Sequence, residues 1–327
     1  MAYGRSDVGR EFAALIAVPV TAGAATVLAE RDGCELQDLV LSPDGRMLVL
    51  LWNVDGGRSV LTALDLADGE QREVGPLPRD VVDDCRISAD GMCLLLTAES
   101  WADRRGVWSL NLASGVGSAV SSSGHGQLRS SRGASTPNID THAAPSLRQL
   151  RGRDGLPISG CLYPAPGPPP WPMMIHLHGG PEAQERPVYN SLFQSLVAAG
   201  VAVFATFHER TEPWIAAAAV SEYGDPQRDA ELLRRLSPIH RIDRLRAPLL
   251  VVHGDEDTNV PVHEAEQVVA ALTDRGVEHR YLLFRGEGHE LLDTANRVAF
   301  VQATVAWVTR HLDVPADALS GPHAGTA

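Results

Sequence analysis

Three short motifs in the second half of the chain contain residue types used in acyl-transfer chemistry. HLHGGP (176–181) is rich in glycine, and glycine lets backbone N–H groups approach a substrate oxygen. HGDEDTNVP (253–261) offers three acids, and GEGHE (286–290) offers an imidazole. An acid that orients a histidine and a histidine that removes a proton are two members of a hydrolase triad.

Each motif follows an apolar run of strand length, and amphipathic segments lie between the runs. Apolar strands separated by such helices are typical of a mostly parallel sheet with helices on both faces. Sites in such sheets lie at the carboxyl ends of the strands, where all three motifs fall. We predict strands at 173–178, 201–206, 216–220, 248–253 and 279–284, and helices at 187–199, 226–236, 262–275 and 295–312.

The first half of the chain contains an internal repeat. The turn LSPDGR begins at Leu41, and its counterpart ISADGM begins at Ile87, 46 positions later. LDLADG (64–69) and LNLASG (110–115) keep the same offset. A period in the forties with several strands per unit is typical of a β-propeller blade. Two copies do not close a propeller, and residues 13–36 could add a strand or two.

These patterns predict four regions. Residues 1–116 form a partial β-propeller-like all-β region, and 117–146, rich in Ser and Gly, form a linker. Residues 147–312 form the α/β domain, which begins with a hairpin around Asp154-Gly155. Residues 313–327 read as a disordered tail.

Composition restricts the partners and the compartment. The chain has 327 residues and a net charge of −13, which argues against a nucleic-acid partner. None of its four cysteines forms a C-x-x-C pair, which suits a reducing compartment. Pro19 and Glu11 interrupt the apolar N-terminal stretch, and no run is long enough to span a membrane. We expect a cytoplasmic protein.

Longer strings around the motifs resemble the prolyl oligopeptidase family of serine peptidases, especially bacterial dipeptidyl-aminopeptidase and acylaminoacyl-peptidase-like members. They are HGGPEAQERP, EYGDPQRDAELLRRLSPIHRIDRLRAPLLVVHGDEDTNVP and YLLFRGEGHE. The resemblance implies an α/β-hydrolase domain preceded by a propeller. It implies short peptides or acyl-peptides as substrates, with no cofactor and no metal.

The same resemblance assigns roles to particular residues. Asp257 is implied as the triad acid and His289 as the triad base. The second oxyanion donor is implied at His178, Gly179 and Gly180.

The nucleophile is the point of departure from the family. The mechanism needs a serine on a G-x-S-x-G turn, and no serine here has glycine at both −2 and +2. In the family the nucleophile strand, its serine and two helices lie between the regions equivalent to 201–206 and 216–220. Here only Phe207 to Ile215 join them. We expect a partly uncovered sheet, strain, exposed apolar surface and self-association.

Two functions remain open, together with two minor alternatives, a substitute hydroxyl nucleophile and a metal site. The family resemblance indicates a serine peptidase. The missing nucleophile favours, for this chain, an inactive remnant that acts as a binding or interaction protein. Thr211, Ser221 and Ser237 are the hydroxyls nearest the gap, but none sits in a glycine turn. The spacing of His176, His178 and His253 suits the hydrolase pattern better than a metal site.

Overall fold

In the computed structural model the chain forms two compact units, Met1–Thr211 and Glu212–Ala327. The structure describes residues 1–121, 142–152, 155, 157–177, 179, 184–207 and 228–314.

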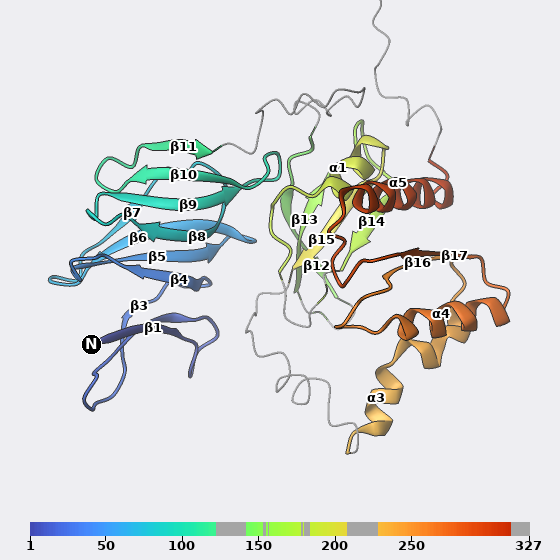
Figure 1. Ribbon diagram of the computed structural model, residues 1–327, viewed down its shortest axis with the longest axis horizontal. Helices are drawn as coiled ribbons and strands as arrows, with labels where there is room; N and C mark the ends of the chain where they lie inside the picture. The colour runs from blue at the N-terminus through green and yellow to red at the C-terminus, as the bar shows by residue number, and fades with distance from the viewer. Residues whose placement is uncertain are drawn as a thin grey trace, which may run out of the picture. The chain divides into compact units, whose positions relative to one another are not determined.

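The sequence repeat forms two four-stranded antiparallel sheets in the first unit (Figure 1). The copies have equivalent strands in the same order, which confirms that the repeat is structural. The first sheet, called the first blade below, comprises β4 (Glu35–Leu41), β5 (Met47–Val54), β6 (Arg58–Asp65) and β7 (Gln71–Val74), and the other sheet is called the second blade. The second comprises β8 (Val81–Ile87), β9 (Cys93–Glu99), β10 (Gly106–Asn111) and β11 (Gly117–Ser121).

The two Asp-Gly turns have the same hydrogen bonds. Ser42 Oγ donates to Asp44 Oδ1 at 2.6 Å, and the N–H of Met47 donates to Ser42 Oγ at 2.9 Å. Ser88, 46 positions on, makes the equivalent two bonds at 2.6 and 2.9 Å. Gly45 and Gly91 have φ of 71° and 73°, values that glycine adopts without steric cost.

A third, three-stranded sheet precedes the repeat. Its strands are β1 (Ala2–Ser6), β2 (Ala14–Val18) and β3 (Thr26–Ala29). The prediction that residues 13–36 add strands is therefore confirmed, and β1 is an additional strand that the sequence did not indicate.

Strand β5 is buried on both faces. Alternate side chains of a strand point to opposite faces. Val49 and Leu51 join one apolar cluster with Leu94 of β9. Leu48 and Leu50 join another cluster with Leu15 of β2. Apolar contacts thus run from the first sheet through β5 to the second blade.

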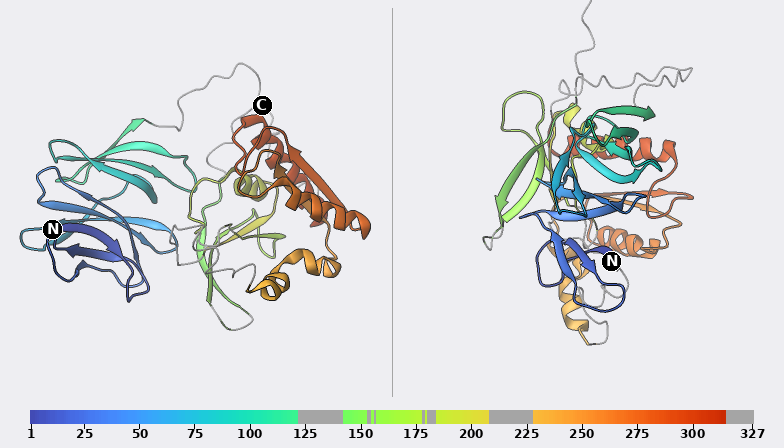
Figure 2. Two further views of the ribbon diagram at one scale, coloured as in Figure 1. Left: turned by 60° about the horizontal axis from the view of Figure 1, so that its bottom comes forward. Right: turned by 90° about the vertical axis from the view of Figure 1, so that its left-hand side faces the viewer.

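The first unit also contains a mixed sheet, coloured green to yellow in Figure 2. Its strand order is β12-β13-β15-β14. Strands β14 and β15 are parallel, and the other pairs are antiparallel. Helix α1 (Ser191–Ala198) begins after Asn190, whose side chain caps it by accepting two backbone N–H bonds. The strands are β12 (Ser146–Arg151), β13 (Pro157–Tyr163), β14 (Met173–His176) and β15 (Ala202–Phe207).

The second unit contains the parallel pair β16 (Leu249–Gly254) and β17 (His279–Phe284). Among the described residues of this unit, the sequence predicted the strands and helices closely, except for the 3₁₀ helix that Pro238 begins. The helices are α3 (Ala230–Leu236), 3₁₀ helix η2 (Pro238–Arg244), α4 (Val262–Asp274) and α5 (Thr294–His311).

Several sequence expectations concern residues outside the described ranges. The strand at 216–220, most of the connection at 207–215 and nearly all of the tail at 313–327 are among them. Within the segment predicted as a linker, residues 117–121 form β11, because they pair with β10 in register with the blade. No helix in the described ranges has the length and apolar content needed to cross a membrane.

Strand β14 and the residue that follows it leave apolar side chains uncovered. Ile175 is 61% exposed and Leu177 is 72% exposed, and Met173 is exposed as well. Among the described strands, β14 lies at the edge of its sheet. This agrees with the exposed apolar surface expected where the nucleophile strand is missing from the sequence.

Candidate active site

Parallel pairing brings Asp257 and His289 to one edge of the second unit. β16 and β17 run in register from Leu249 opposite His279 to Gly254 opposite Phe284, so their carboxyl ends meet. The loops beyond them also hydrogen-bond, with the N–H of Glu256 donating to the carbonyl of Glu287 at 2.9 Å. A Cβ at Gly254 would collide with that carbonyl, which explains the glycine.

Asp257 and His289 form a hydrogen-bonded pair. His289 Nδ1 lies 2.9 Å from Asp257 Oδ2. The carboxylate is 5% exposed, whereas the imidazole is 54% exposed. A carboxylate only accepts, so Nδ1 carries the proton and Nε2 is left to accept one. This is the tautomer that a general base needs.

The backbone holds the other oxygen of Asp257. Oδ1 accepts from the N–H groups of Asn259 at 2.8 Å and Val260 at 2.9 Å. The Val260 bond lowers the pKa of Asp257 most, and His289 and Asn259 lower it further. Asp257 is therefore a fixed anion at neutral pH.

The three acids of this motif have different partners. Asp255 accepts from the N–H of Gly286 at 2.7 Å and pairs with Arg285 at 3.2 Å, so it holds the two loops together. Glu256 joins them through its backbone. Of these three acids, only Asp257 has a hydrogen bond to an imidazole in the part of the chain that the structure describes.

A second histidine borders the pair. His253 Nε2 lies 2.9 Å from the carbonyl of Val260 and 3.7 Å from Asp257 Oδ2. The carbonyl accepts, so Nε2 of His253 donates. An open pocket of about 210 Å³ surrounds the pair, lined by Val252, His253, Gly254, Asp257, Val260, Gly288, His289 and Leu291.

Glu287 anchors the loop at 286–290 that carries His289, a role that the sequence pattern did not indicate. It is 3% exposed. Its carboxylate accepts from the N–H groups of Leu292 at 2.8 Å and Asp293 at 3.1 Å and from Asn296 Nδ2 at 2.7 Å. The Asn296 bond is the main cause of its lowered pKa. The loop is thereby fastened to the start of α5, two residues from His289.

The glycine motif, HLHGGP at 176–181, belongs to the first unit. His178 and Gly180 fall outside the described residues. Gly179 is exposed, and a Cβ there would have no heavy atom within 4 Å. His176 pairs with Glu185 at 3.4 Å and packs edge-on against Phe193. In the described ranges no three His, Cys, Asp or Glu residues converge as a metal site would require.

The fold is that of an α/β hydrolase preceded by a partial propeller. A puromycin-hydrolyzing peptidase of Mycobacterium tuberculosis superimposes with a TM-score of 0.76 at 16% identity, over 95% of this chain and 61% of that one. A puromycin hydrolase superimposes with a TM-score of 0.76 at 18% identity, over 93% of this chain and 59% of the other. The predicted fold class is confirmed.

Residues 188–315 match the prolyl oligopeptidase family. Over 106 residues the chain is 31% identical to dipeptidyl aminopeptidase BIII of Pseudoxanthomonas mexicana, covering 32% of this chain and 15% of that enzyme. Over 86 residues it is 34% identical to acylamino-acid-releasing enzyme 2 of Oryza sativa subsp. japonica, covering 26% and 11%. The chain thus matches only a small part of these curated relatives.

Proposed function

We propose that this chain is a serine-type hydrolase of short peptides or acyl-peptides, with His289 as general base and Asp257 as its orienting acid. The contact of 2.9 Å between His289 Nδ1 and Asp257 Oδ2 carries the proposal. It is supported by the family match over residues 188–315 and by relatives whose names describe peptidases.

In the proposed reaction His289 Nε2 takes the proton from a hydroxyl as its oxygen attacks the substrate carbonyl carbon. Asp257 stabilises the imidazolium that forms. The proton then passes to the leaving amine as the scissile bond breaks, and water hydrolyses the acyl-enzyme by the same route. His178, Gly179 and Gly180 are proposed to supply the oxyanion donor. The scheme uses no cofactor and no metal.

A second candidate is a binding protein that retains the acid–base pair without a nucleophile. One observation favours it: no serine of the 327 residues has glycine on both sides at the required spacing. Among the described residues, the hydrogen bonds of His289 include no hydroxyl.

A fluorophosphonate probe separates the two candidates, because it labels an activated hydroxyl. We expect labelling of the folded chain and a loss of roughly 10²- to 10⁴-fold in its rate in His289→Ala. The control is His263→Ala, an exposed histidine on α4. Mass spectrometry of the adduct identifies the nucleophile. No labelling of a folded sample supports the binding protein.

The proposed setting is the cytoplasm, without a nucleic-acid or membrane partner. All four cysteines, Cys34, Cys85, Cys93 and Cys161, are free thiols, and free thiols persist in reducing compartments. The net charge of −13 disfavours phosphate backbones. Fractionation of the native host and retention on heparin resin test both statements.

A further inference from the structure

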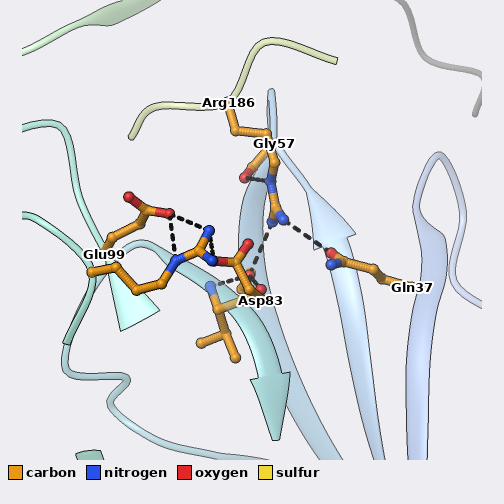
Figure 3. A network of polar contacts seen from close by, with 8 residues as sticks. Gln37, Gly57, Asp83, Glu99 and Arg186 are labelled. Atoms are coloured by element: carbon orange, nitrogen blue, oxygen red, sulfur yellow. Dashed lines mark hydrogen bonds and ion pairs between the residues drawn. The ribbon is translucent and has the colours of Figure 1, made fainter. Parts of the chain in front are cut away.

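Arg186 forms a polar anchor within the first unit (Figure 3). Its side chain is partly buried and donates from all three of its nitrogens. Nε bonds the carbonyl of Gly57 at 2.7 Å, Nη1 bonds Gln37 Oε1 at 3.1 Å, and Nη2 bonds Ser59 Oγ at 3.1 Å. A planar guanidinium suits this arrangement, since its donors form a rigid fork.

All three acceptors come from the first blade, more than 120 positions away in sequence. Gln37 lies on β4, Gly57 in the turn before β6, and Ser59 on β6. Ser59 is 7% exposed and also accepts from the N–H of Val82 on β8 at 2.8 Å. Arg186 therefore reaches the place where the two blades join.

Two acids of the second blade influence the pKa of Arg186. Burial lowers the pKa of Arg186, and the carboxylates of Asp83 and Glu99 act in the opposite direction. Arg105 pairs with both acids, at 2.5 Å from Asp83 and 3.0 Å from Glu99 (Figure 3). The two acids thus offset part of the electrostatic cost of burying the guanidinium of Arg186.

The blade is shaped to admit this side chain. Gly57 has φ of +97°, and a Cβ there would come within 3.0 Å of Arg186 Cγ and 3.3 Å of its Cα. A side chain at residue 57 would therefore press on the arginine.

Neighbouring residues add two further attachments. Asn53 Nδ2 of β5 donates to Gln184 Oε1 at 2.6 Å. Glu185 pairs with His176 at the end of β14 at 3.4 Å. Residues 184–186 are thus tied on one side to the blade and on the other to the mixed sheet.

We propose that Arg186 is a positioning residue that fixes residues 184–190, which precede α1, to the junction of the two blades. Contacts with the blades then determine how firmly residues 184–190 are held in one conformation. The anchoring is independent of the proposed function, whereas a role of the anchored residues in substrate binding rests on that function.

Hydrogen–deuterium exchange read by mass spectrometry tests the anchor. In Arg186→Met, amide exchange in peptides covering 184–190 should rise about tenfold or more, because three neutral acceptors lose the hydrogen bonds that Arg186 donates. Peptides of β5 should keep their wild-type rates. The matched control is Arg148→Met, an exposed arginine on β12 of the same unit, which should leave both regions unchanged.

Two milder variants keep the test decisive if Arg186→Met does not fold. Gln37→Met removes one acceptor and should raise exchange at 184–190 by a smaller factor. Arg186→Lys keeps the charge without the fork and should restore part of the protection. Unchanged exchange at 184–190 in all three variants, or an equal rise throughout the unit, would overturn the proposal.

The fluorophosphonate reaction adds the link to function. Its rate should fall in Arg186→Met and recover in part in Arg186→Lys at temperatures where both are folded. Labelling that persists at the wild-type rate while exchange rises would remove the role in substrate binding and leave the anchor. Absence of labelling in the wild-type chain would count against the proposed function alone.

Discussion

The blade strand β5 and the α/β strand β14 contrast in how their apolar side chains are covered. Val49 and Leu51 of β5 are 0% exposed, and both faces of that strand pack on neighbouring sheets. Ile175 of β14 is 61% exposed. The blades bury their own apolar surface within the described part of the chain, whereas the edge of the mixed sheet leaves such surface uncovered.

The largest expected effect is a loss of stability when an apolar side chain is removed from the core of the blades. Leu51→Ala should lower the free energy of unfolding of its unit by about 2–5 kcal/mol, because it leaves a cavity between packed sheets. Leu177→Ala, at 72% exposure, should change it by less than about 0.5 kcal/mol. Urea unfolding followed by tryptophan fluorescence measures both. Equal losses would remove the contrast.

The repeated turns provide a smaller effect within the blades. Gly45→Ala and Gly91→Ala should each cost about 1–2 kcal/mol, since both glycines have positive φ. Gly4→Ala is the control: φ is not in that region and an added Cβ meets no atom within 4 Å. The two turn variants should agree in thermal denaturation. A clear difference between them would show that the two blades are not equivalent.

Glu287 gives a pH-dependent effect in the second unit. Its pKa is lowered from 4.5 in the folded chain, so its stabilisation is complete above that pH and is lost as the pH falls below it. Glu287→Gln should therefore be less stable than wild type at pH 7, and the difference should shrink in acid. Thermal melts from pH 7 to pH 3 test this. Glu290→Gln, at an exposed neighbour, should not reproduce that pattern.

The smallest expected change in stability accompanies a change in association. Ile175→Lys places a charge on the exposed edge strand and should reduce self-association, because charged side chains hinder edge-to-edge pairing. Its unfolding free energy should stay within about 0.5 kcal/mol of wild type. Light scattering across a concentration series is the measurement, with Ile175→Val as control. A monomeric wild-type chain would contradict the expectation.

The local sequence pattern predicted those strands and blades whose formation depends on residues close together in the chain. The repeat identified the blades, and the apolar runs located β16 and β17 and hence the edge where Asp257 meets His289. That edge follows from parallel pairing alone, so the sequence was sufficient to predict it.

Residues that act through distant contacts could not be predicted in this way. Arg186 bonds partners more than 120 positions away, and nothing near it in sequence indicates burial. Glu287 looks like a surface acid, yet its neighbours fold back to donate three hydrogen bonds to it. For both, the signal would have been a charged residue required at a buried position, which a single sequence does not reveal.

The matching turns at Ser42 and Ser88 have a consequence for how such a chain changes in length. Each blade closes its own hairpin with its own serine and aspartate, and its strands pair within the same sheet. Gain or loss of one 46-residue module by recombination would therefore break no strand pairing inside the remaining modules.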